Sequence, residues 1–155
     1  MAEYILMRIA AEDGKKLNIA SAGLFAGNGS PINDKSAEIL QKYYSDSNET
    51  EPFIKGHSSR QLTESMVEEA DHILAMTKDH AEYLAEIYPE HAAKFTALGE
   101  YSKDLPEPWG SRLDVLDPFG SPLNVYDETY EQLKLLLEAW YGSHVKENKH
   151  EEDEL

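Results

Sequence analysis

The sequence predicts a doubly wound α/β domain, in which a parallel sheet carries helices on both faces. Segments with the apolar spacing of helices alternate with short strand-like segments along the chain, and this alternation is typical of a parallel sheet. Residues 72–76 (HILAM) form an unbroken run of strand length, as expected for a strand buried on both faces. A length of 155 residues, 41% of them hydrophobic, suits one domain with a sizeable core.

Five helices follow from the spacing of apolar residues and from residues that begin or end helices. Thr63 and Thr77 are suited to cap helix starts, and Pro89 and Gly142 are suited to end helices. The expected ranges are residues 2–13, 34–44, 64–70, 78–88 and 125–141.

Four strands are expected between these helices, at residues 17–20, 53–54, 72–76 and 94–98. A glycine-rich connection over residues 21–31 and a long proline-containing loop before the last helix complete the chain. The order is therefore α-β-α-β-α-β-α-β-α, and it starts with a helix. Doubly wound domains normally start with a strand, and the loop after that strand commonly binds phosphate. We therefore expect the opening strand and its loop to lie upstream of Met1.

Charge and composition exclude several classes of function. With 30 acidic and 14 basic residues the net charge is −16, which disfavours binding to nucleic acids and to anionic membrane surfaces. No run is apolar enough for a membrane span and no secretory signal is present, so we expect a cytoplasmic protein. Residues 1–142 form the expected domain, and residues 143–155 form an acidic, disordered tail.

The chain contains no cysteine, which excludes disulfides, thiolate metal sites and thiol nucleophiles within these 155 residues. The histidines show no close metal-ligand spacing, and neither a P-loop nor a dinucleotide fingerprint is present. No cofactor or metal is expected. Oligomeric state is left open by the sequence.

Four local sequences occur in an order and spacing that point to one family. They are SAG at 21–23, GHSSRQLT at 56–63, ADHILAMT at 70–77 and DVLDPFG at 114–120. Together they make the chain resemble a low-molecular-weight protein-tyrosine phosphatase from about Met1 to Tyr141. The resemblance implies a flavodoxin-like sheet and phosphorylated protein substrates.

The resemblance also implies a reaction centre that these residues do not contain. The family carries its nucleophilic cysteine and phosphate-binding arginine in a Cys-x5-Arg-Ser-Pro loop, directly ahead of a helix that starts like Met1-Ala2-Glu3. This chain begins after that loop, so the first and central strand, the cysteine and the arginine are expected to be missing. Loss of a central strand would leave buried backbone groups unpaired, at about 1–3 kcal/mol each, so we expect an unstable chain.

The family's general acid matches Asp117, which stands directly before Pro118. An aspartic acid on a restrained loop can protonate the leaving group. The alternative for Asp117 alone is an ordinary Asp-Pro turn. Asp114 is interpreted as a loop residue without an assigned role.

Ser21 and His57 match residues that hold the family's phosphate-binding loop by hydrogen bonds. A hydroxyl and an imidazole suit that task, although a turn serine and a surface histidine are the ordinary alternatives. Phe119 would form part of the substrate pocket, or else pack as a loop aromatic. A phenylalanine at this position is more similar to the bacterial protein-arginine phosphatases of the family than to its tyrosine phosphatases.

Two functional hypotheses result. In the first, the complete protein dephosphorylates phosphotyrosine or phosphoarginine in proteins through a cysteinyl-phosphate intermediate. In the second, the chain is a truncated, inactive remnant or a noncatalytic binding protein, because it lacks the cysteine and the arginine. As written, the chain is expected to be inactive.

Overall fold

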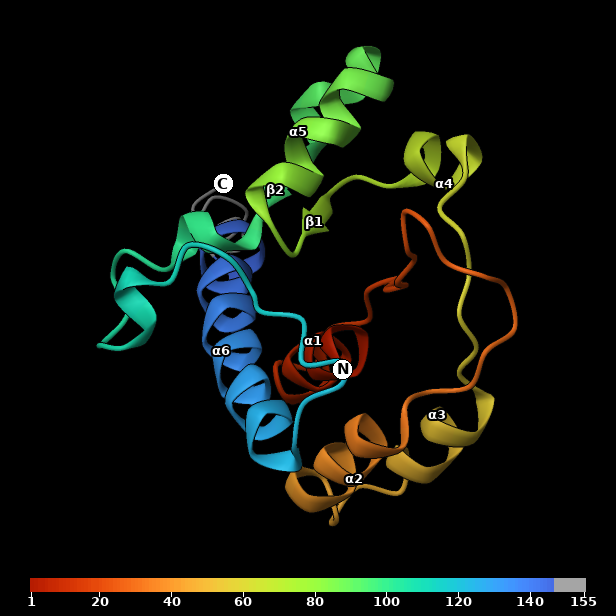
Figure 1. Cartoon of the computed structure of the whole chain (residues 1–155), viewed down its shortest axis with the longest axis vertical. Helices are drawn as coiled ribbons and strands as arrows, with labels where there is room; N and C mark the ends of the chain where they lie inside the picture. The colour runs from red at the N-terminus through yellow and green to blue at the C-terminus, as the bar shows by residue number, and fades with distance from the viewer. Residues whose placement is uncertain (147–155) are drawn as a thin grey trace.

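A computed structural model describes residues 1–146 of the chain (Figure 1). The α-helices within these residues are α1 (Ala2–Glu12), α2 (Asp34–Tyr43), α3 (Thr50–Gly56), α4 (Glu64–Glu69), α5 (Lys78–Ile87) and α6 (Leu123–Tyr141). The strands are β1 (Ile73–Ala75) and β2 (Phe95–Ala97). Short 3₁₀ turns are η1 (Pro89–Lys94), η2 (Leu98–Tyr101) and η3 (Trp109–Ser111), and η4 (Gly142–Lys146) is a π-helical turn.

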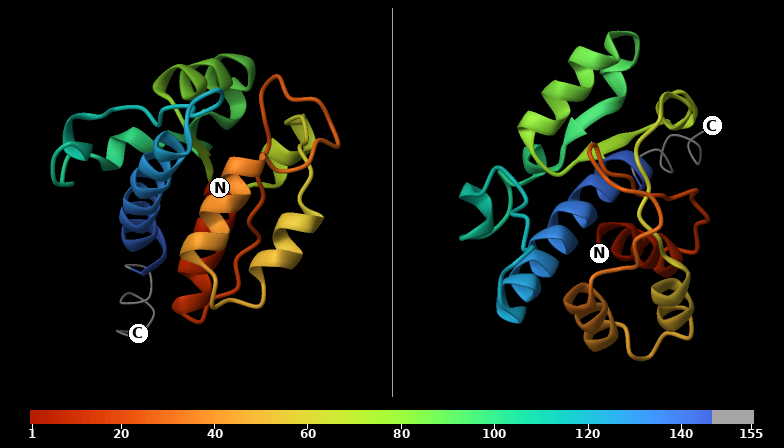
Figure 2. Two further views of the ribbon diagram at one scale, coloured as in Figure 1. Left: turned by 60° about the horizontal axis from the view of Figure 1, so that its bottom comes forward. Right: turned by 45° about the vertical axis from the view of Figure 1, so that its right-hand side comes forward.

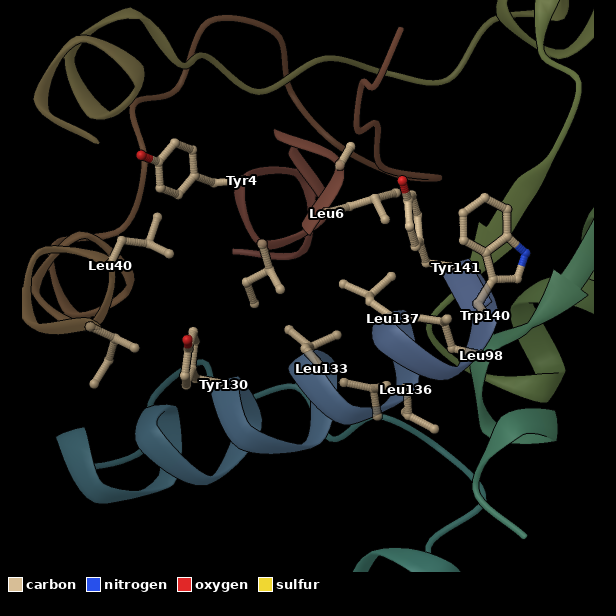
Figure 3. Close-up of a cluster of buried hydrophobic side chains, with 14 of the residues drawn as sticks. Tyr4, Leu6, Leu40, Leu98, Tyr130, Leu133, Leu136, Leu137, Trp140 and Tyr141 are labelled. Carbon is tan, nitrogen blue, oxygen red and sulfur yellow. The ribbon is translucent and has the colours of Figure 1, made fainter. Parts of the chain in front are cut away.

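The core lies where α6 packs against α1 and α2. Leucines of α6 form one buried cluster with Ile5 and Leu6 of α1 and Leu40 of α2. Figure 3 shows Tyr4 and Tyr130 on the side of this cluster toward α2. Leu136 and Leu40 are fully buried, and each such leucine contributes about 1.5–3 kcal/mol through removal of apolar surface from water. This burial explains why the apolar spacing correctly predicted α1, α2 and α6.

The α/β class and the parallel sheet are confirmed. β1 and β2 are parallel, with Ile73 opposite Phe95 and Ala75 opposite Ala97. α5 contacts both strands, whereas Leu74 packs against the core cluster of α1 and α6, so helices lie on both faces. In the right-hand view of Figure 2, α6 and α1 lie between the sheet with α5 and the pair α2 and α3.

Two predicted strands are wrong. Residues 17–20 form no strand, and the nearest pairing is an isolated parallel bridge between Gly23 and Gln61. A strand needs a paired neighbour, and in residues 1–146 none pairs with this segment. Residues 53–54 lie in α3, where the Phe53 ring packs against Tyr4 at 4.7 Å between ring centroids. The sequence could not show this, because two apolar residues alone carry no periodicity that separates a strand from a helix.

The predicted depth of β1 is also corrected. Ile73 and Leu74 are only half-buried, while Ala75 is buried. Within the described residues β1 pairs with β2 only, so its other edge contributes no backbone pairing. An apolar sequence therefore marked the strand correctly and overstated its burial.

The boundaries of the middle helices follow their predicted caps, but the last helix does not end as expected. The hydroxyls of Thr63 and Thr77 accept hydrogen bonds from the N–H groups of Met66 and His80, at 3.3 and 3.1 Å. Gly142 has a φ of −58° instead of a left-handed conformation, so the chain continues into η4. Residues 143–146 of the predicted tail belong to this turn, and residues 147–155 lie outside the described residues.

Candidate active site

A buried carboxylate marks the amino end of α1. Glu3, in the first turn, has a side chain only 8% exposed. Its Oε2 lies 3.1 Å from Nδ1 of His57 and accepts a hydrogen bond from the Ser21 hydroxyl at 3.4 Å. Its Oε1 lies 3.9 Å from Nη2 of Arg60. A buried carboxylate needs partners that compensate its lost hydration, and the side chains of Ser21, His57 and Arg60 together provide them for Glu3.

Backbone pairing brings these side chains to α1 from distant parts of the sequence. The Gly23 N–H donates to the Arg60 carbonyl, and the Leu62 N–H donates to the Gly23 carbonyl, both at 2.9 Å. The segment after Ser21 therefore runs beside the segment after His57. His57 itself directly follows the last residue of α3, so α3 sets its position.

The Glu3 cluster borders a small cavity of about 210 Å³. Its wall is formed by Glu3, Pro52, Phe53, Gly56, His57, Ser58 and Arg60. The amino end of a helix carries partial positive charge, which favours negative groups such as the Glu3 carboxylate. The hydroxyl, imidazole and guanidinium around it can also donate hydrogen bonds to an adjoining loop.

The predicted acid lies elsewhere, on an exposed loop that leads into α6. The Asp117 side chain is exposed, and its Oδ1 accepts a hydrogen bond from the Phe119 N–H at 3.1 Å. The Phe119 side chain is 79% exposed. Gly120, at a φ of +81°, makes the turn toward Pro122 and α6 in a conformation that glycine adopts readily. The carboxyl group is thus held by a local turn and remains accessible to solvent.

The structure therefore joins two of the four predicted site residues and keeps the other two apart. Ser21 and His57 meet at Glu3, whereas Asp117 and Phe119 do not line the Glu3 cavity. This arrangement by itself leaves the predicted roles of all four residues as predictions.

Sequence reasoning missed Glu3 and Arg60 as members of the cluster. Glu3 did carry a signal, because a glutamate between Met1 and the apolar residues Tyr4 to Leu6 stands on a face that packs into the core. Arg60 carried none, since its role depends on a contact with α1.

Within residues 1–146, no group of three or more histidine and carboxylate side chains is placed to bind a metal ion. In the same part of the chain, no helix combines the length and the apolar character that a membrane span requires.

Comparison with known proteins gives one family. The sequence model of the family described as "Low molecular weight phosphotyrosine protein phosphatase" matches residues 1–151. A protein-arginine-phosphatase of Bacillus subtilis is 34% identical over 137 residues, which are 88% of this chain and 82% of that protein.

Solved structures agree with this result. The low-molecular-weight protein tyrosine phosphatase from T. tengcongensis superposes with a TM-score of 0.77 at 33% identity, over 92% of this chain and 88% of that one. The YwlE arginine phosphatase, as a cysteine-to-serine mutant with a phosphorylated active site serine, superposes with a TM-score of 0.76 at 31% identity, over 94% and 88%. The chain therefore belongs to the low-molecular-weight phosphotyrosine protein phosphatase family.

Proposed function

We propose that this protein is a phosphatase that acts on phosphotyrosine or phosphoarginine side chains of proteins, with Asp117 as its general acid. The observation that carries the proposal is the convergence of Ser21 and His57 on the first turn of α1. In the family, the phosphate-binding loop directly precedes this helix, so both side chains stand where they can hold such a loop. The relatives include proteins named for each of the two substrates.

The proposed reaction has two steps. A cysteine thiolate attacks phosphorus, the bond from phosphorus to the leaving oxygen or nitrogen breaks, and Asp117 gives its proton to that leaving atom. Water then attacks the cysteinyl phosphate, with Asp117 as the base, and releases inorganic phosphate and the free thiolate. A relative whose active site serine, in place of cysteine, is phosphorylated supports a covalent intermediate.

The proposed thiolate belongs to the family's Cys-x5-Arg loop, which the 155 residues, without a cysteine, do not contain. In the proposed site, Ser21 and His57 hold that loop and Phe119 forms a wall of the substrate pocket. The proposed location is the cytoplasm, with no cofactor.

The test compares the 155-residue chain with a version extended by a strand and a Cys-x5-Arg-Ser-Pro loop. Turnover of an aryl phosphate, a phosphotyrosine peptide and a phosphoarginine peptide is measured for both. We expect turnover only in the extended protein, where Asp117→Asn lowers kcat by about 10²–10⁴-fold. The ratio of kcat/KM for the two peptides identifies the preferred substrate.

The absence of cysteine favours a second candidate, a noncatalytic protein that binds phosphorylated partners. It predicts that the 155-residue chain binds a phosphopeptide in a calorimetric titration without turnover, and that the extended protein also fails to hydrolyse it. Turnover by the extended protein would exclude this candidate.

A further inference from the structure

We propose that Gln132 and Asp114 are positioning residues that anchor the loop carrying Asp117; the inference rests on the proposed function, since it gives the loop its purpose. Gln132 lies in α6, and Asp114 lies three residues before the predicted acid.

Gln132 is a polar side chain in an apolar place. It is 2% exposed, beside Leu133 and Leu136 of the core. Its Nε2 donates a hydrogen bond to the backbone carbonyl of Asp114 at 3.0 Å. A buried amide costs about 1–3 kcal/mol unless it is hydrogen-bonded. A leucine at this position would avoid that cost, so we attribute the glutamine to its hydrogen bond with the loop.

Asp114 and its neighbour are tied to a second element at the same point. Asp114 Oδ1 accepts a hydrogen bond from the Lys78 N–H at 2.9 Å, in the first turn of α5, where helix peptide dipoles favour a carboxylate. The Val115 N–H donates to the Met76 carbonyl at 3.0 Å. Three hydrogen bonds over two residues therefore fasten the loop to α6, to the first turn of α5 and to the connection between β1 and α5.

Two further contacts hold the loop at its two ends. Leu113 lies so close to Gly99 that a Cβ on Gly99 would stand 1.4 Å from the Leu113 carbonyl oxygen. At the far end, the Lys35 ammonium donates to the Ser121 carbonyl at 2.6 Å. Between these fixed ends, Leu116 and Phe119 are 55% and 79% exposed. The Asp117 carboxyl group accepts a hydrogen bond from within this loop, at the Phe119 N–H, so the position of the local turn that holds it depends on the anchors.

The test uses nuclear magnetic resonance on the 155-residue chain and needs no turnover. The Phe119 amide donates to Asp117, so its chemical shift reports ionisation of that carboxyl group when pH is varied. Gln132→Leu removes the donor at similar volume. We expect at least tenfold faster hydrogen exchange at the Val115 amide and a smaller pH-dependent shift at Phe119.

Thr129→Val is the matched control. Thr129 is also buried in α6, but its hydroxyl donates to the Val125 carbonyl at 2.9 Å within the helix. We expect Val115 exchange and the Phe119 shift to stay at parent values in this variant. Parent-like behaviour of Gln132→Leu, or equal changes in both variants, would overturn the anchor.

A second pair of variants decides the matter if Gln132→Leu does not fold. Asp114→Asn keeps an oxygen that can accept from Lys78, whereas Asp114→Ala keeps none. We expect the asparagine variant to retain the Phe119 shift and the alanine variant to lose it; identical spectra would contradict the proposal. An inactive extended protein would refute the proposed function and leave these measurements unaffected.

Discussion

The two halves of the candidate site are built in opposite ways. Around Glu3, side chains from two other segments meet at a buried carboxylate of α1 and so fix one another. On the loop of Asp117, the side chains of Asp117 and Phe119 are exposed, and hydrogen bonds to other elements hold the loop near its two ends. Side chains around a buried carboxylate can be fixed by burial, whereas the proposed acid lies in solvent and the position of its loop depends on anchors farther along the chain.

The largest loss of stability is expected where Leu113, at the start of the Asp117 loop, contacts Gly99 of η2. Gly99→Ala places a Cβ at 1.4 Å from the Leu113 carbonyl oxygen, so backbone must move, at a cost of about 3 kcal/mol in the free energy of unfolding. Urea denaturation measures this loss. Gly27→Ala is the control, because Gly27 is exposed and has no atom within 4 Å of the added Cβ. Equal stability of the two variants would show that the loop base is not tightly held.

The Glu3 cluster should respond less strongly. His57→Ala removes the partner of Glu3 at 3.1 Å and leaves a buried carboxylate with weaker contacts. We expect a loss of about 1–3 kcal/mol in the free energy of unfolding. His80→Ala, at an exposed position of α5, is the matched control and should stay near the parent value. If both variants unfold at the same denaturant concentration, the cluster is not held together by burial.

A hydrogen bond from α6 holds the carboxyl end of α1, the end away from the Glu3 cluster. The Tyr141 hydroxyl donates to Asp13 at 2.6 Å, and burial, with help from this hydrogen bond, raises the pKa of Tyr141 to about 12. Above the ordinary value of about 10, the unfolded chain loses this proton while the folded chain keeps it. The contribution of Tyr141 to the free energy of unfolding is therefore complete below a pH of about 10 and is lost as the pH rises to about 12.

Tyr141→Phe isolates this contribution. At pH 9 we expect the variant to be less stable than the parent by about 1 kcal/mol, since the hydrogen bond is absent. The difference should shrink as pH rises toward 12, because phenylalanine has no proton to lose. Chemical denaturation at several pH values measures the difference, and a constant gap would argue against a raised pKa.

How much of the molecule the sequence could predict depends on the range of the interactions. The spacing of Leu133, Leu137 and Trp140 predicted α6 because helical periodicity is local. Residues 17–20 were mistaken for a strand because strand formation requires a partner that the local pattern cannot show. The parallel sheet was predictable from alternation, but the depth of β1 was not.

The same distinction holds for the site. Ser21, His57 and Asp117 were predicted from local motifs of the family, and their roles stay predictions. Glu3 and Gln132 were not, since each gains its role from contacts with residues far away in the sequence. Asp114 was found and left without a role, because its hydrogen bonds join it to α5 and α6.

The smallest change in stability is expected at Phe119, which is exposed on the Asp117 loop and so differs most from the buried residues around Glu3. Phe119 is 79% exposed, so Phe119→Ala removes little buried surface and should change the free energy of unfolding by less than about 0.5 kcal/mol. Phe53→Ala is the comparison, because its ring packs on Tyr4 beside the Glu3 cluster, and its loss should be clearly larger. Should Phe119→Ala destabilise the chain as much as Phe53→Ala does, the tip would be part of the core and the proposed division of the site would fail.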